Sequence, residues 1–241
     1  AVATVGGQTL VDRCFAGETS LCSAIIRNAP GPGETLGTIK IVENAPFNLA
    51  SLHQQGWDFE ASYGTSLDRF VESWKGDLAL RALGTHVAFS RRDDGINPVV
   101  NYAGTNSGQG PLSWRWTFSA NYSLDRFSAT WTGRFMSSGR YGGDTIQYLQ
   151  CNPGSCPESN PTIRTIDSNH IDSRFYQDLA LTYRFLETDD GTTAQAYLNV
   201  SNLMNKKPPL VASTAYWYMT VNPQMYDVVG RRFYAGIRFE M

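Results

Sequence analysis

The last thirteen residues of the chain alternate strictly between apolar and polar side chains. Phe233, Ala235, Ile237, Phe239 and Met241 share one parity, while Arg232, Tyr234, Gly236, Arg238 and Glu240 share the other. Successive side chains of a β-strand point to opposite faces of its sheet, so this segment predicts a strand with one apolar and one polar face. Such a strand is typical of a wall between lipid and a polar lumen.

The same period of two recurs upstream. Trp114, Trp116, Phe118, Ala120 and Tyr122 share one parity, and similar alternation fills residues 126–140 and 172–186. Alternation held over roughly nine or more residues matches the length that a tilted strand needs to cross a bilayer. A soluble antiparallel sheet with one wet face produces the same alternation, so both interpretations stay open at this point.

Composition excludes several other classes of protein. The 241 residues are 41% apolar and 17% charged, with a formal net charge of -2. The chain is therefore neither disordered nor basic enough to indicate nucleic-acid binding. No apolar run exceeds residues 215–219, which excludes a transmembrane helix. The first residues contain no initiator Met and no secretory signal, so we expect a chain that begins inside a longer one.

The lengths of the connections favour the membrane interpretation. Short connections are predicted around residues 66–70, 123–127 and 188–192, and the last contains an Asp-Gly turn signal. Long stretches rich in Gly, Asn, Pro and Ser cover residues 92–111, 137–171 and 204–228. Short and long connections alternate, which places all the short ones at one end of the sheet. Outer-membrane barrels have short periplasmic turns and long extracellular loops, whereas long irregular loops are uncommon in compact soluble domains.

Counting back from the C-terminus, we predict about seven antiparallel strands. They cover residues 48–65, 75–91, 112–123, 126–140, 172–186, 193–203 and 229–241. The second of these changes parity between Leu80 and Val87, which indicates either a bulge near Gly84 or a misplaced boundary. Seven strands cannot close an even-numbered barrel. The predicted fold is therefore all-β: the C-terminal part of a large antiparallel transmembrane β-barrel with long extracellular loops and short periplasmic turns.

Two segments near the C-terminus resemble the closing strands of TonB-dependent outer-membrane receptors. They are Tyr-Leu-Asn-Val-Ser-Asn-Leu-Met-Asn-Lys-Lys-Pro-Pro at 197–209 and Tyr-Asp-Val-Val-Gly-Arg-Arg-Phe-Tyr-Ala-Gly-Ile-Arg-Phe at 226–239. The cysteine segment at 14–22 is similar to a loop of that family's barrel. The segment at 47–63, with Phe-Asn-Leu-Ala-Ser-Leu followed by Gly-Trp-Asp-Phe-Glu-Ala-Ser-Tyr, is similar to one of its strands.

The resemblance covers nearly the whole chain and implies its place in a larger protein. Members of the family are 22-stranded barrels with an N-terminal plug domain and a short box that engages the inner-membrane energy transducer. Residues 1–241 would then be the C-terminal portion of the barrel, with the plug domain absent from this sequence. The chain departs from the family at Met241, where members usually end in an aromatic residue.

The four cysteines form two local pairs. Cys14 and Cys22 are eight residues apart, Cys151 and Cys156 are five apart, and the predicted topology places both pairs in extracellular loops. Oxidation is permitted there, so we expect two local disulfides, with free thiols as an alternative. A zinc site would require the two distant pairs to meet, and neither has a nearby His, so no metal site is predicted.

Catalytic motifs are lacking in the sequence. The three histidines are isolated from one another, and neither Gly-x-Ser-x-Gly nor a phosphate-binding glycine loop occurs. Asp58 and Glu60 share the polar face of one strand and could be paired acids. We instead expect lumenal carboxylates balanced by Arg81, Arg115 or Arg134. The sequence therefore predicts neither an enzyme nor a cofactor.

Three functions remain. The first is an outer-membrane receptor that binds a scarce bulky ligand, such as an iron chelate, a vitamin or an oligosaccharide, and imports it with energy from the TonB system. The second is a passive porin-like channel, and the third is a soluble β-sandwich binding module. For the receptor, the expected partners are outer-membrane lipid, the TonB complex through the missing N-terminal region, and an extracellular small-molecule or oligosaccharide ligand. Tyr216, Trp217 and Tyr218 are candidate ligand contacts in a loop.

Overall fold

A computed structural model of the chain describes residues 6–45, 51–93, 99–106, 110–141, 147–150, 163–166, 170–189, 191–210 and 221–240. The chain divides into two compact units. The smaller comprises residues 1–53 and 91–101, and the larger comprises residues 54–90 and 102–241. Each unit is described by itself below.

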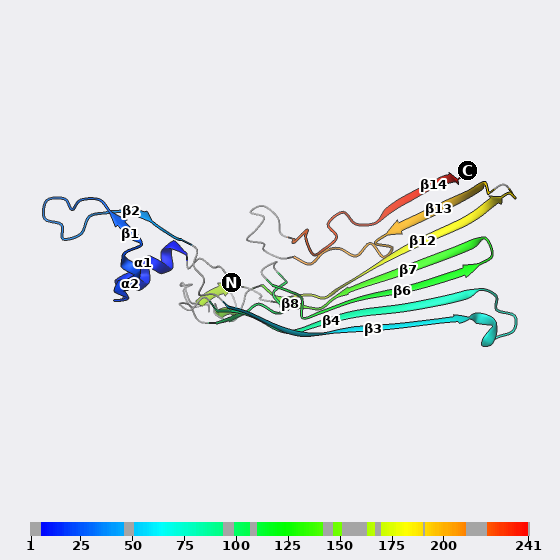
Figure 1. Cartoon of the computed structure of the whole chain (residues 1–241), viewed down its shortest axis with the longest axis horizontal. Helices are drawn as coiled ribbons and strands as arrows, with labels where there is room; N and C mark the ends of the chain where they lie inside the picture. The colour runs from blue at the N-terminus through cyan, green and yellow to red at the C-terminus, as the bar shows by residue number, and fades with distance from the viewer. Residues whose placement is uncertain are drawn as a thin grey trace. The chain divides into compact units, whose positions relative to one another are not determined.

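The smaller unit contains two short helices and a two-stranded ribbon (Figure 1). The helices are α1 (Gly7–Phe15) and α2 (Thr19–Cys22), and the strands are β1 (Ile25–Arg27) and β2 (Ile39–Val42). The strands pair antiparallel, with Ile25 opposite Val42. Leu10 of α1 is buried. The sequence pattern predicts no helix in this region, so α1 and α2 are additions to a fold that is otherwise mostly antiparallel β-sheet, as predicted.

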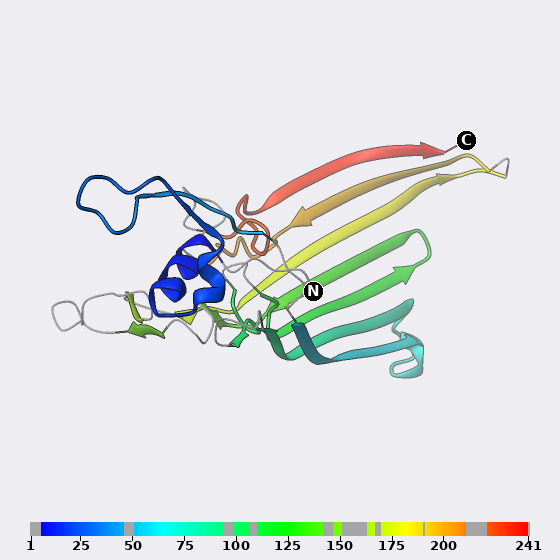
Figure 2. The same cartoon turned by 60° about the vertical axis from the view of Figure 1, so that its left-hand side comes forward.

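The larger unit is built on a sheet of seven long antiparallel strands, visible side by side in Figures 1 and 2. In sequence order they are β3 (Ser51–Ser66), β4 (Asp77–Asp93), β6 (Trp114–Leu124), β7 (Phe127–Met136), β12 (Arg174–Glu187), β13 (Thr193–Ser201) and β14 (Arg232–Glu240). Their order across the sheet is the same, from β3 at one edge to β14 at the other. Each of the seven predicted strands is confirmed, with bounds that differ by a few residues.

Shorter elements lie between the long strands. They are the 3₁₀ turn η1 (Leu67–Arg69) and the strands β5 (Val100–Asn101), β8 (Gly139–Arg140), β9 (Gln147–Gln150), β10 (Ile163–Ile166) and β11 (His170–Ile171). β5 pairs with the end of β4, β8 pairs with β11, and β9 runs parallel to β10. β8 lies at the end of the predicted strand 126–140, and the other four belong to long connections in which the sequence pattern predicts no strand.

The predicted alternation of short and long connections is confirmed. Two residues join β6 to β7, and one of them, Asp125, has a φ of 48°, a left-handed conformation that Asp tolerates better than most residues. The β12–β13 connection closes with a hydrogen bond of 3.0 Å from the Thr188 N–H to the Thr192 carbonyl, and Gly191 has a φ of 90°. Because consecutive strands are antiparallel neighbours, these turns lie at one end of the sheet and the long connections at the other.

Of the two explanations for the parity change, a bulge near Gly84 is not found in the pairing of β4 with β6. β4 and β6 pair in unbroken register from Asp77 opposite Ser123 to His86 opposite Trp114. Gly84 lies directly opposite Trp116, where a Cβ would approach the indole ring to 2.5 Å. The glycine therefore gives the ring room to lie over β4.

The change of parity in β4 has a different cause. Val87 and Ser90 point to opposite faces of the strand, yet both are buried. This end of the strand is buried on both faces. Apolar and polar side chains therefore no longer need to alternate along it. A register shift of the predicted kind occurs instead in β12, where Phe185 is the extra residue between Arg184 and Leu186.

Candidate functional site

One face of the large sheet is apolar from edge to edge and remains exposed. The residues on it that are at least partly exposed include Trp57, Phe59, Tyr63, Leu80, Tyr183, Leu198, Phe233, Ile237 and Phe239. Trp57 near one edge is 62% exposed and Phe233 at the other is 64% exposed. Single exposed apolar residues are ordinary, but a continuous apolar surface across seven strands marks contact with a partner or with lipid.

Aromatic side chains are grouped at the two ends of this apolar face. Near the long connections, His86 stacks on Trp114 at 4.2 Å between ring centroids, and Trp114, Trp116 and Phe118 continue the stack along β6. Near the short turns, Tyr122 and Phe127 lie 6.4 Å apart. The β6 residue between these groups on the same face is Ala120. Trp131 of β7 lies directly opposite Ala120, so a ring also occupies the middle of the face.

The opposite face is polar, and much of its charge is neutralised between neighbouring strands. Arg81 of β4 donates two hydrogen bonds to Glu60 Oε1 of β3, at 3.0 and 2.7 Å. Asp58 accepts a hydrogen bond of 2.8 Å from Thr85. Asp58 and Glu60 are thus separately partnered, as predicted for Glu60 and Arg81, and do not form a pair of acids poised for proton transfer.

Farther along the same face, Arg134 of β7 lies 3.0 Å from Asp178 of β12. Arg134, which was predicted to balance Asp58 or Glu60, therefore pairs with a different carboxylate. Thr130 donates a hydrogen bond of 2.8 Å to Asn121 across the β6–β7 pair. Exposed ion pairs of this kind add about 0–1 kcal/mol each, so they contribute little to the stability of the sheet.

Asn202 fastens the connection that follows β13. It is fully buried, and its backbone N–H donates to Asp178 Oδ1 at 2.8 Å. Its side-chain amide donates to the Lys206 carbonyl at 3.0 Å and accepts from the Lys206 N–H at 2.8 Å. A φ of 51° at Asn202 turns the chain so that both bonds can form. The Asn202 side chain thus closes the loop, and its backbone N–H joins the loop to Asp178 of β12.

Asp227 and Asn205 anchor the segment that leads into β14. Asp227 Oδ1 accepts hydrogen bonds from the N–H groups of Val229 and Gly230, at 3.0 and 3.2 Å. Asn205 Oδ1 accepts from the Arg231 N–H at 3.2 Å, which joins the two loop segments. These side chains therefore fix the two ends of the β13–β14 connection.

A small core lies beside these loop segments. Met136, Ile171, Tyr176 and Tyr226 are buried together, with Leu112 and Met225 packed against them. Burial raises the pKa of the Tyr226 phenol above its ordinary value, so this side chain is neutral at physiological pH. The core holds the last loop segment against the long-connection end of β7 and β12.

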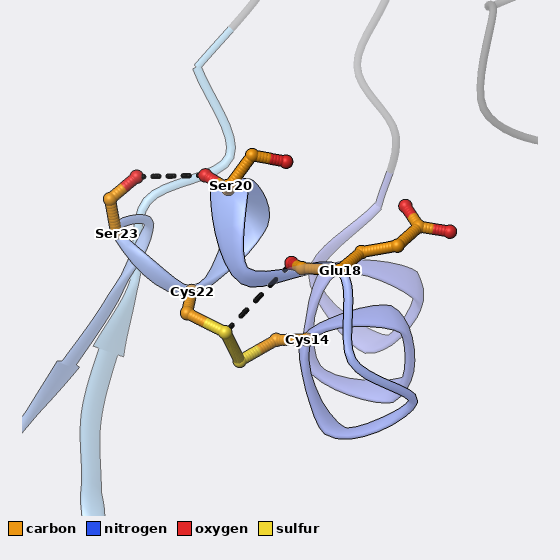
Figure 3. Close-up of a disulfide and its surroundings, with 5 residues drawn as sticks. All are labelled: Cys14, Glu18, Ser20, Cys22 and Ser23. Atoms are coloured by element: carbon orange, nitrogen blue, oxygen red, sulfur yellow. Dashed lines mark hydrogen bonds between the residues drawn. A yellow bond between two sulfur atoms is a disulfide. The ribbon is translucent and has the colours of Figure 1, made fainter.

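Cys14 and Cys22 form a disulfide, as predicted (Figure 3). It joins the last turn of α1 to the end of α2, and an ion pair of 2.6 Å between Arg13 and Glu18 spans the same turn. The second predicted pair, Cys151 and Cys156, lies outside the described residues. So do the candidate ligand contacts Tyr216, Trp217 and Tyr218.

No protein-family model matches the chain, and neither a curated protein nor a solved structure matches it. Within the described ranges, no helix is both long and apolar enough to cross a membrane. The same part of the chain contains no group of three or more His, Cys, Asp or Glu side chains placed to hold a metal ion.

Removing the disulfide should loosen the helical segment without melting the sheet. In the Cys14→Ser, Cys22→Ser double variant, the entropy regained by the unfolded segment corresponds to about 2–3 kcal/mol for a loop of this length. Amide exchange should accelerate in α1 and α2 and stay unchanged in β6 and β7. Alkylation of unreduced protein followed by mass spectrometry checks the bond itself, and labelling of Cys14 and Cys22 would contradict it.

Replacing Asn202 should release the β13–β14 connection. Asn202→Ala leaves the Lys206 N–H and carbonyl without their partner at about 1–3 kcal/mol for each unmet group, and the left-handed φ adds about 1–2 kcal/mol. Asn202→Gly is the matched control, because it relieves the backbone strain but still lacks the two side-chain bonds. Limited proteolysis of residues 202–210 should be fastest in the Ala variant and intermediate in the Gly variant. Equal rates in all three proteins would show that Asn202 does not anchor the loop.

Proposed function

We propose that this chain forms part of the wall of a transmembrane β-barrel in the bacterial outer membrane. The observation that carries the proposal is the exposed apolar face that spans all seven strands, opposite a polar face that carries the Arg81–Glu60 and Arg134–Asp178 ion pairs. Lipid on one side and an aqueous lumen on the other account for both faces. The aromatic groups at the two ends of the apolar face fit the two membrane interfaces.

The open edges of the sheet support the same proposal. Among the described strands, β3 and β14 each pair on one side only. An unpaired edge in hydrocarbon leaves backbone groups unsatisfied at several kcal/mol each, so these edges require further strands. The described sheet is then one section of a larger barrel.

We further propose that this barrel is an energy-coupled receptor of the TonB-dependent kind, which binds a scarce bulky ligand at the cell surface and imports it. The support is the resemblance of residues 197–209 and 226–239 to the closing strands of that family. Three of those residues, Asn202, Asn205 and Asp227, anchor the connection between the last two strands through hydrogen bonds. The plug and the contact with the TonB complex would lie in the region outside this sequence.

A soluble β-sandwich has less support. Such a module buries the apolar face of one sheet against a second sheet of similar size. The other sheets found in the described residues have two strands each.

Adjacent positions of β6 test which face meets lipid. Ala120→Arg places a charge in the middle of the apolar face and should cost about 2–4 kcal/mol there, whereas Ser119→Arg places the same side chain on the polar face. In the intact protein, Ala120→Arg should reduce the folded, heat-modifiable species in the outer-membrane fraction, and Ser119→Arg should leave it near the unmodified level. Equal loss in both variants would contradict the assignment of the faces.

Electrical conductance separates the receptor from a passive channel. The intact receptor in a planar lipid bilayer should show no steady conductance, because a plug fills its lumen, and it should bind the purified periplasmic domain of TonB. A porin-like barrel would instead show a large, steady conductance and no binding to that domain. The second outcome would replace the receptor proposal with that of a channel, while leaving the membrane barrel intact.

A further inference from the structure

A hollow of about 380 Å³ lies on the polar face of β12, β13 and β14. These three strands run side by side in the sheet (Figure 2). It is lined by six polar side chains: Thr182, Gln195, Tyr197, Asn199, Tyr234 and Arg238. Its volume falls within the range of about 300–1,000 Å³ found for ligand pockets. These residues come from three adjacent strands, so the sheet itself holds their spacing.

A glycine shapes the hollow. Tyr197 of β13 lies directly opposite Gly236 of β14, and a Cβ at Gly236 would come within 2.6 Å of the Tyr197 hydroxyl. The tyrosine side chain therefore extends over β14 at the one position of that strand without a side chain. Tyr234 and Arg238 flank the glycine on the same face of β14. The missing side chain leaves space between them.

The side chains around the hollow differ in their hydrogen bonding from the acidic side chains of the polar face. Asp58, Glu60 and Asp178 all bond to side chains of neighbouring strands. Within the described part of the chain, by contrast, the six lining side chains form no hydrogen bond or ion pair with one another or with other residues. Their donors and acceptors are available to a ligand.

The free groups define the chemistry of that ligand. Gln195 and Asn199 each offer an amide donor and an acceptor, and Thr182 and both tyrosines offer hydroxyls. Such a set suits a molecule with many hydroxyl groups. The two tyrosine rings also supply apolar surfaces against which the C–H faces of a sugar ring can pack.

Arg238 indicates the charge that a matching ligand would carry. It is the single cation among the six, and a guanidinium binds a carboxylate through two parallel hydrogen bonds. A ferric chelate with several negative charges would leave most of its charge unbalanced here. One cation among neutral hydrogen-bonding groups instead fits a largely neutral ligand with one acidic group.

We propose that this hollow is a binding subsite for an acidic saccharide, with Arg238 on the carboxylate and Tyr197 and Tyr234 against the sugar rings. This inference rests on the proposed function, because it requires the polar face to line the lumen of the receptor. It narrows the imported ligand to the saccharide class. It also places recognition on the barrel wall as well as in the surface loops.

A matched pair of sugars tests the subsite. Cellobiouronic acid differs from cellobiose by one carboxylate, and calorimetry on the intact protein in detergent measures binding of both. We expect the acid to bind at least ten-fold more tightly, which corresponds to about 1.4 kcal/mol. Arg238→Gln should abolish that preference, while Tyr234→Ala should weaken binding of both sugars. Arg115→Gln, on the polar face of β6 outside the hollow, is the control and should change neither.

Two results would overturn the inference. One is folded, heat-modifiable protein that binds neither sugar, or that binds both equally with no effect of Arg238→Gln. The other is a Tyr234→Cys variant whose thiol resists a small alkylating reagent in ligand-free protein, which would show that another segment of the protein fills the hollow. Either result leaves the barrel proposal standing, since that proposal depends on the apolar face and is tested at Ala120.

Discussion

The backbone hydrogen-bond ladder that joins the seven long strands is the interaction on which the rest of the structure depends. In an ordinary globular domain the apolar side chains are buried and hold the fold together. Here much of the apolar face of the large sheet remains exposed, and the polar face contributes ion pairs that are individually weak. The cohesion of the described sheet therefore comes from paired backbone groups, and the apolar face gains stability only from what surrounds it.

Because the ladder is nearly unbroken, the two faces must adapt to it. Where a large ring lies over a neighbouring strand, the residue directly opposite is a glycine, as at Gly84 beneath Trp116 and at Gly236 beneath Tyr197. Where pairing is interrupted, at Phe185, the irregularity lies beside the β12–β13 turn and away from the middle of the sheet. The regular register is also what places three strands' side chains around one hollow.

The long strands could be predicted from the sequence because a period of two that extends over nine or more residues is rarely produced by anything except a strand. The same rule fails at the end of β4, where burial on both faces removes the alternation. The pattern there allows a bulge near Gly84 or a misplaced boundary, and the unbroken pairing with β6 rules out a bulge on that side of the strand. The helix α1 was missed because it lies in a segment where the cysteines were interpreted as a loop, and no capping side chain marks its start.

The candidate sites were harder to predict, for a physical reason. Asp178 and Asn202 are 24 residues apart in sequence, and Tyr197 and Gly236 are 39 apart, so their contacts exist only once the strand register is known. The sequence showed that each residue lies on a polar face or in a loop, which is a property of one strand at a time. What those residues do depends on neighbours across the ladder. On one part of the face, neighbouring side chains bond to each other, as Arg81 and Glu60 do, so these groups are already engaged and do not offer bonds to a ligand. Around Arg238 the neighbouring side chains form no such bonds to the described residues, and their free donors and acceptors allow that part of the wall to bind a ligand.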